Sequence, residues 1–253
     1  MKLVTVFVGV SLALSVFAGP EWGYNAPWGP SHWGNEVGYE TCGTGAEQSP
    51  ILIESGAIAG LRNTFPDNSL EPIRPNWSPA AIQVLNNGHT LQNVYAPGST
   101  LEFETITYDL KQFHFHSPSE HLLDERQYPL EAHFVHATAN GNLLVVGVFF
   151  KVGAENGELA KVWKNAPTTA GQTNTSPELV SAAELWPGTG EYYTYSGSLT
   201  TPPCSESVRW IVMKQPVEAS PEQLRFLQQT MGGANNRPIQ PLDGRLISTG
   251  DQH

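Results

Sequence analysis

The sequence predicts one mainly β domain built on a largely antiparallel sheet. Seven short runs rich in β-branched and aromatic residues are separated by turn residues, which is the pattern of antiparallel strands. Only one stretch carries strong helix signals, and no repeat, linker or low-complexity tract divides the 253 residues. With 40% hydrophobic residues, a chain of this length suffices for one sizeable core.

The predicted strands begin well inside the chain. Residues 19–45 are rich in Gly, Pro and Trp without any period, so we expect an irregular segment packed over the domain. The strands follow at 81–85, 90–95, 107–116, 130–138, 142–152, 192–196 and 206–217. The run 142–152 is almost unbroken in apolar residues, which predicts a central strand covered on both faces. Residues 164–177 are polar and predict a loop.

One helix is predicted at 221–231. Ser220 suits the N-cap, and Gln223 completes a capping box with it. Pro221 fits the first helical position, and Gly232 ends the helix.

The first eighteen residues predict a signal peptide. Lys2 precedes an apolar run at 3–17, and Ala18 provides a small residue for cleavage. The run is too short for a membrane span, and the polar end at 251–253 is no lipid-anchor signal. We therefore expect a secreted, extracellular protein without a membrane anchor, whose residues 19–253 form a single domain.

Charge, cysteines and sequons fit secretion. A formal net charge of −11 argues against nucleic-acid or anionic-membrane partners. Cys42 and Cys204 are expected to pair in an oxidising compartment, with two free buried thiols as the alternative. Asn76 and Asn174 begin glycosylation sequons, but a proline follows each sequon, so occupancy is left open.

Histidines alternate along the predicted strand 107–116. His114 and His116 point to one face, and their Cα atoms lie about 6.6 Å apart because side chains alternate with period two. Phe113 and Phe115 point to the other face, which suits a core. Taken alone, such histidines also fit half-buried structural residues.

A third histidine makes a metal site possible. If 130–138 neighbours the first strand, His133 completes a three-histidine site with an open fourth position, the pattern of a catalytic zinc. Gln112 and Glu131 each precede a ligand by two residues on the same face. They are candidates to hydrogen-bond the imidazoles from behind and fix their tautomers.

The motifs together resemble the α-class carbonic anhydrases. The resemblance rests on His114-x-His116 with Glu120, on Glu131-x-His133, and on Leu199-Thr200-Thr201-Pro202-Pro203-Cys204. It extends to Gln48-Ser49-Pro50-Ile51, Asn86-Asn87-Gly88-His89 and Asn236-Arg237-Pro238-Ile239-Gln240-Pro241-Leu242. These matches keep the family's order from about Trp22 to Arg245, nearly the whole mature chain.

The resemblance implies a fold and an activity. The fold would be mainly β, an α+β roll in some schemes, with one twisted sheet of about ten strands and short peripheral helices. The activity would be that of a carbonate dehydratase, in which Zn²⁺-bound hydroxide attacks carbon dioxide to give bicarbonate. Thr200 would orient that hydroxide and pass its own proton to the buried carboxylate of Glu120.

The resemblance also implies how substrate and proton are handled. A wall for carbon dioxide maps onto Val135, Val145, Leu199, Val208 and Trp210, with Thr201 beside it. His89 resembles the family's proton shuttle, and an ordinary histidine pKa near 6.5 suits that task. Tyr24, Asn87 and Gln92 would line a polar side; Gln92 departs from the family's usual asparagine.

Two other interpretations of the function remain possible from the residues alone. His114-x-His116-x3-Glu120 also fits the first metal motif of cupins, in which the glutamate would be a ligand. A carbonic-anhydrase-like binding module without catalysis is the second, although known modules lack a ligand histidine. A small-molecule substrate is expected, and monomer and homodimer both remain possible.

Overall fold

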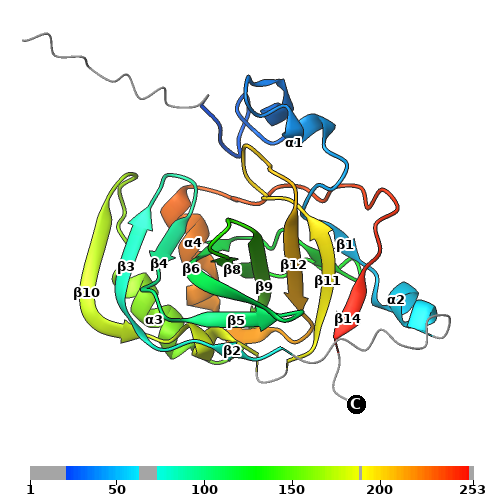
Figure 1. Cartoon of the computed structure of the whole chain (residues 1–253). Coiled ribbons are helices and arrows are strands. Elements are labelled where there is room, and N and C mark those ends of the chain that lie inside the picture. Colours follow the sequence, from blue (N-terminus) through cyan, green and yellow to red (C-terminus); the bar gives the residue numbers. More distant parts are fainter. Residues whose placement is uncertain (1–20, 63–72, 188–189, 251–253) are drawn as a thin grey trace, which may run out of the picture.

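The computed structural model describes residues 21–62, 73–187 and 190–250. The predicted signal peptide, residues 1–18, lies outside the described residues. Figure 1 shows a strongly twisted sheet at the centre, with helices at its periphery.

A mixed sheet of twelve strands dominates the molecule. Its main path runs β10 (Thr173–Val180), β3 (Ala80–Asn86), β4 (Leu91–Val94), β6 (Ile106–His116), β8 (Leu130–Ala137), β9 (Leu143–Val152), β12 (Val208–Met213), β11 (Tyr192–Gly197) and β14 (Ser248–Gly250). Off this path lie β2 (Pro75–Asn76), β5 (Thr100–Phe103) and β13 (Val217–Ala219). β1 (Leu52–Ile53) and β7 (Leu122–Leu123) form a separate parallel pair. The predicted β fold is confirmed, and the strands beyond the expected ten include pieces of only two or three residues.

The sheet is antiparallel except around β9. β9 pairs in parallel with β12 and with β13, and in antiparallel with β8. Its residues from Leu144 to Phe150 are all buried, as predicted for a central strand. β6 and β8 are antiparallel neighbours, which is the condition for His133 to meet the histidines of β6.

The two faces of β6 serve different purposes. Phe113 and Phe115 enter the larger hydrophobic core, where the ring of Phe115 packs against Trp163 at 4.7 Å. Trp163 belongs to α3 (Gly157–Lys164), which with α4 (Pro221–Met231) covers this face of the sheet. The histidines are therefore left on the opposite face, as the alternation in sequence predicts.

The predicted helix 221–231 is confirmed as α4 with both of its end signals. The Ser220 hydroxyl accepts a hydrogen bond from the Gln223 backbone, and the Gln223 side chain accepts one from the Ser220 backbone. Gly232 follows in the left-handed conformation at φ 73°, which favours glycine. α1 (Thr41–Thr44), α2 (Ser55–Arg62) and two 3-10 turns (Trp33–Asn35 and Ala182–Leu185) are the other described helical elements.

Two sequence predictions of local structure are wrong. The polar stretch 164–177 is not all loop, because strand β10 begins at Thr173 and pairs with β3. β10 lies at the end of the sheet path. All of its side chains but the last are exposed or half-buried, so it needs no alternating apolar pattern. The run 206–217 is also not one strand, since a turn after Met213 separates β12 from β13.

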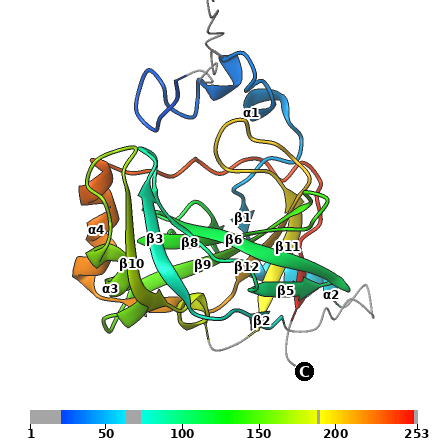
Figure 2. The same ribbon diagram turned by 60° about the vertical axis from the view of Figure 1, so that its left-hand side comes forward.

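The N-terminal segment lies over one end of the sheet, near the loop between β11 and β12 (Figure 2). The predicted disulfide between Cys42 and Cys204 is confirmed and fastens the segment to that loop. Arg237, 2% exposed, donates hydrogen bonds to the carbonyls of Cys42 and Ser49 and to the Gln48 side chain. Covalent and polar links thus hold this largely irregular segment in place.

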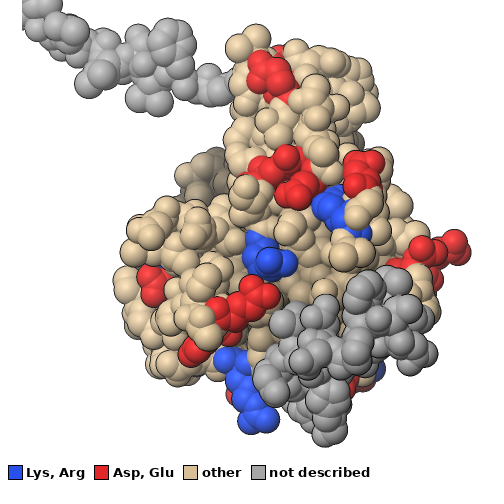
Figure 3. Space-filling model, turned by 45° about the vertical axis from the view of Figure 1, so that its right-hand side comes forward, with Lys and Arg blue, Asp and Glu red and all other residues tan. Residues whose placement is uncertain are grey.

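The described surface carries no broad basic area on the face of Figure 3, where acidic and basic side chains are interspersed. Among the described residues, no helix is long and apolar enough to cross a membrane.

Candidate metal centre and cavity

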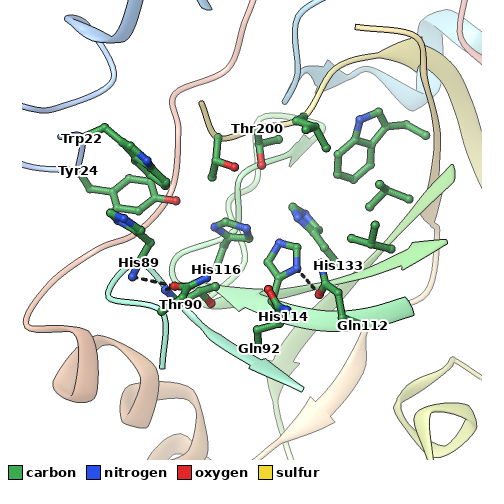
Figure 4. A pocket seen from close by; sticks show the side chains of 16 residues that line it. Trp22, Tyr24, His89, Thr90, Gln92, Gln112, His114, His116, His133 and Thr200 are labelled. Atoms are coloured by element: carbon green, nitrogen blue, oxygen red, sulfur yellow. Dashed lines mark hydrogen bonds between the residues drawn. The ribbon is translucent and has the colours of Figure 1, made fainter. Parts of the chain in front are cut away.

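Three histidines on neighbouring strands turn their rings toward one point (Figure 4). His114 and His116 come from β6, and His133 lies opposite His114 in the register of β8. The ring centroids are separated by 5.1 Å within β6 and by 5.3 and 4.7 Å across the strands. One ring nitrogen from each histidine lies within 4.8 Å of the other two, so the group can hold a metal ion.

In each ring, the nitrogen that does not face this point is held by a hydrogen bond to the protein. His114 Nδ1 donates to Gln112 Oε1 (2.9 Å), His116 Nδ1 to the carbonyl of Asn235 (2.7 Å), and His133 Nε2 to Glu131 Oε1 (3.0 Å). The nitrogens left for a ligand are Nε2 of the two β6 histidines and Nδ1 of His133. Nε2 of His116 is buried and has no hydrogen-bond partner among the described residues, so it is free to coordinate an ion.

Burial keeps these imidazoles neutral. It lowers the pKa of His116 to about 4, and burial, followed by the proximity of His116 and His133, holds the pKa of His114 well below its ordinary value. Burial also lowers the pKa of His133, despite the nearby Glu131. Neutral imidazole is the form that binds zinc, so the donor set fits this metal at neutral pH.

Glu131 belongs to a buried hydrogen-bonded chain behind His133. Its Oε1 also accepts from His121 Nδ1 (2.7 Å), and His121 Nε2 accepts from the Tyr195 hydroxyl (2.7 Å). Tyr195 is bonded in turn to the Ser49 hydroxyl (2.8 Å). Burial opposes the charge of Glu131, but His121 and His133 hold its pKa well below the ordinary value. The carboxylate therefore stays charged and keeps His133 in one tautomer.

Glu120 lies beside the histidines but outside the converging group of nitrogens. Its Oε1 accepts from the Arg237 backbone (2.8 Å), and its Oε2 lies 3.5 Å from Nε2 of His116. Burial raises the pKa of Glu120 to about 7, against the effects of His133, the Arg237 N–H and the Thr200 hydroxyl. Thr200 thus lies close enough to Glu120 to affect its pKa, while Oε2 of Glu120 is buried without a hydrogen-bond partner among the described residues.

A cavity of about 230 Å³ leads to the three histidines. Its apolar wall contains Val135, Val145, Leu199 and Trp210, and its polar residues include Tyr24, Asn87, Gln92, Gln112, Thr200 and Thr201. Val208 is not on this lining; it is 1% exposed and packs in the apolar cluster that also contains Trp210. Within the described part of the chain the buried Tyr24 hydroxyl has no hydrogen-bond partner, so it is available to a water molecule.

His89 stands at the polar side of the cavity, across from the metal-binding rings (Figure 4). Its ring is half-buried and stacks on the indole of Trp22, with centroids 3.6 Å apart and planes 10° apart. This partial burial lowers the pKa of His89 from its ordinary value.

The sequence matches a known family over most of its length. The model of the eukaryotic-type carbonic anhydrase family matches residues 28–250. The chain belongs to the α-class carbonic anhydrase family. The resemblance and the enzyme class predicted from the motifs, a carbonate dehydratase, are thereby confirmed. The cupin alternative is wrong, because the family match and the likeness of the fold to solved α-carbonic anhydrases exclude it.

Relatives and solved structures agree with this assignment. A carbonic anhydrase of Pectobacterium carotovorum is 40% identical over 245 residues, which cover 96% of this chain and 97% of that protein. The α-carbonic anhydrase of Thermovibrio ammonificans, solved with sulfanilamide, superposes with a TM-score of 0.83 at 45% identity; it covers 91% of this chain and 100% of its own.

The fold alone does not determine the ligand. A structure of dioscorin complexed with ascorbate superposes with a TM-score of 0.82 at 30% identity, covering 92% of this chain and 99% of that one. The assignment of a reaction to this carbonic anhydrase family member therefore depends on its own site residues.

Sequence reasoning missed several residues that build the site. Asn235 holds His116 through its carbonyl oxygen, which leaves no trace in residue type. Arg237 lies within the motif 236–242, which does not reveal that its backbone N–H binds Glu120. Gly147 on β9 faces His133 in register, where a glycine inside a strand was an available signal of close approach. Asn76 and Asn174 are both exposed, and glycosylation there stays a prediction.

Proposed function

We propose that the chain is a zinc enzyme that hydrates carbon dioxide reversibly to bicarbonate and a proton. The observation that carries this proposal is the convergence of three neutral imidazoles, two of them fully buried and His114 partly buried, each with one nitrogen held by a hydrogen bond to the protein. His114, His116 and His133 would hold the ion. Bound zinc lowers the pKa of a water in its open position to about 7, a value established for carbonic anhydrase itself and not obtained from this structure.

Thr200 and Glu120 would orient the nucleophile. The Thr200 hydroxyl adjoins the Glu120 carboxyl group and would accept a hydrogen bond from the attacking oxygen while donating to Glu120. This arrangement selects groups that can donate a hydrogen bond and points a lone pair at the substrate. Val135, Val145, Leu199 and Trp210 would form the surface that carbon dioxide contacts, because it is an apolar molecule; Val208 would support that surface from behind.

His89 would carry the proton out of the cavity. It lines the same cavity as the three metal-binding histidines, among polar groups that can hold connecting water. Tyr24, Asn87 and Gln92 are those groups in this chain. Because the burial of His89 lowers its pKa, its ring is the neutral, proton-accepting form at neutral pH.

We infer further that the protein acts outside the cytosol. The Cys42–Cys204 disulfide supports this location, because structural disulfides form in oxidising compartments. The leader at 1–18 is the sequence feature that would direct it there.

The test is carbon dioxide hydration, followed by stopped flow, before and after removal of metal with a chelator. We expect the chelated protein to lose activity and stoichiometric zinc to restore it, whereas the His116→Ala variant should respond to neither treatment. Activity that persists in the metal-free protein would contradict the proposal. Stoichiometric zinc binding without turnover would instead support the binding-module alternative.

A further inference from the structure

Asn235 connects three segments of the site with one residue. It lies after α4 and is 2% exposed. Its carbonyl accepts from Nδ1 of His116 (2.7 Å), and its Oδ1 accepts from the backbone of Ser117 (2.8 Å). Its side-chain nitrogen Nδ2 donates to two backbone carbonyls, those of His89 and Phe115, at 3.0 Å each.

The two carbonyls bound by Nδ2 belong to different functional segments. Phe115 lies between the two metal-binding histidines of β6, and His89 lies in the turn 87–90 that leads into β4. A single nitrogen that donates to both fixes their separation, because each hydrogen bond tolerates little stretching. Thr90 adds a second link, since its hydroxyl donates to the Phe115 carbonyl at 2.5 Å.

Only an amide side chain can donate these two hydrogen bonds and accept the third one from Ser117. Asparagine offers two N–H donors and one carbonyl acceptor, and all three are used here. Aspartate has the same size and keeps the acceptor for Ser117, but in its charged form it would turn a carboxylate toward two carbonyl oxygens. The backbone carbonyl that binds His116 would remain in either case.

We propose that Asn235 is a positioning residue for proton export: its side-chain amide sets the distance between His89 and the metal-binding strand. This inference rests on the proposed function, in which His89 accepts the proton. Proton transfer through water requires unbroken hydrogen bonds, so a displacement of about 1 Å in the His89 backbone interrupts it. On its other side the His89 ring is held by the Trp22 indole, so the two contacts together define its place (Figure 4).

The test compares Asn235→Asp with a matched control, Asn93→Asp. Asn93 is also fully buried, and its side chain accepts from Gln83 and donates to Val94, without a hydrogen bond to His89 or to a metal-binding residue. Asn235→Ser, which adds no charge, serves as the second variant if Asn235→Asp does not fold.

The first measurement is hydration kinetics of the zinc-loaded proteins. The constant kcat/KM covers the steps up to bicarbonate release, whereas kcat in weak buffer also contains proton export. We expect Asn235→Asp to lose at least about tenfold in weak-buffer kcat, with kcat/KM changed less than about twofold. Concentrated imidazole buffer should restore kcat, and Asn93→Asp should resemble the parent.

The second measurement needs neither zinc nor activity. In the zinc-free parent, the stacked Trp22 ring shields the His89 ring protons, whose NMR signals are identified by their loss in His89→Ala. We expect these signals to move downfield in Asn235→Asp and to stay in place in Asn93→Asp.

The outcomes distinguish the role proposed for Asn235 from the proposed function of the protein. An equal fall in kcat and kcat/KM, failure of imidazole to restore kcat, or unmoved His89 signals would overturn the role of Asn235 and leave the proposed function intact. A zinc-loaded parent that does not hydrate carbon dioxide would overturn both.

Discussion

A single side chain, Val145, illustrates how strand register forms the apolar wall. It lies opposite Val135 of β8 on one side and Trp210 of β12 on the other, so the three form one row across three strands. All three line the cavity that ends at the histidines. Val145 is 2% exposed, so a larger side chain at this position must extend into the cavity or disturb the packing of the sheet.

Val145→Tyr should abolish carbon dioxide hydration while zinc stays bound. The phenol ring would occupy the space beside the metal, whereas the substitution changes none of the three ligand histidines. Stopped-flow hydration and zinc content by mass spectrometry check both parts. Turnover equal to that of the parent would show that the substrate does not use this wall.

Trp22 should tune the pH range in which His89 works. Burial lowers the pKa of His89, and the stacked indole provides part of that burial. Trp22→Ala should therefore raise the pKa of His89 toward 6.5. Because the neutral ring accepts the proton, the acid limb of the weak-buffer kcat profile should move to higher pH.

The control for this prediction is Trp28→Ala, a substitution of an exposed tryptophan in the same N-terminal segment. It should leave the profile in place. NMR titration of His89 gives the same comparison without kinetics, and an unchanged midpoint in Trp22→Ala would refute the prediction.

At the scale of elements, strand β9 makes room for the group that orients His133, because Gly147 of this strand has no side chain. Gly147 lies opposite His133 in register. A Cβ atom at this position would stand 2.8 Å from Oε1 of Glu131, the oxygen that binds both His121 and His133. The glycine thus leaves the space that the carboxylate occupies.

Gly147→Ala should weaken zinc binding by about 10- to 100-fold, the usual effect of disturbing a group that orients a metal ligand. A competing chelator measures the dissociation constant. Gly153→Ala, just after β9, is the control, because the three atoms nearest its Cβ would all belong to the exposed side chain of Glu218. Equal zinc affinity in Gly147→Ala and the parent would contradict this account.

Elements were predictable from sequence where their signals are local. β6 shows alternation, β9 an apolar run, and α4 both caps, and each was found at nearly its observed bounds. β10 was missed because an exposed strand paired on one side needs no apolar face. The histidines of the site follow from strand parity, but Asn235 acts through a carbonyl and tertiary contacts that no residue pattern encodes.

At the scale of the whole molecule, the disulfide joins the N-terminal segment to the loop that carries Thr200. Cys42 and Cys204 are 162 residues apart, so their bond closes a loop that contains most of the sheet. Arg237 binds the same segment through the Cys42 carbonyl, and its backbone binds Glu120. The position of Thr200 relative to Glu120 thus depends on links between distant parts of the chain.

Replacing both cysteines by serine should lower the free energy of unfolding by about 3–5 kcal/mol, an upper value from the chain entropy of so long a loop. Urea unfolding of the zinc-free proteins measures it. A thiol reductant should move the parent toward the variant and leave the variant unchanged. Equal stability of the two proteins would show that other links already hold the segment.

The two ends of the sheet path affect how the protein behaves at high concentration. At one end β10 contains Pro177, which lacks an N–H, and its pairing with β3 shifts register between Ser176 and Leu179. At the other end β14 has only three residues. An incoming strand from a second molecule therefore finds few consecutive backbone groups to bind, which opposes fibrillar aggregation despite the size of the sheet.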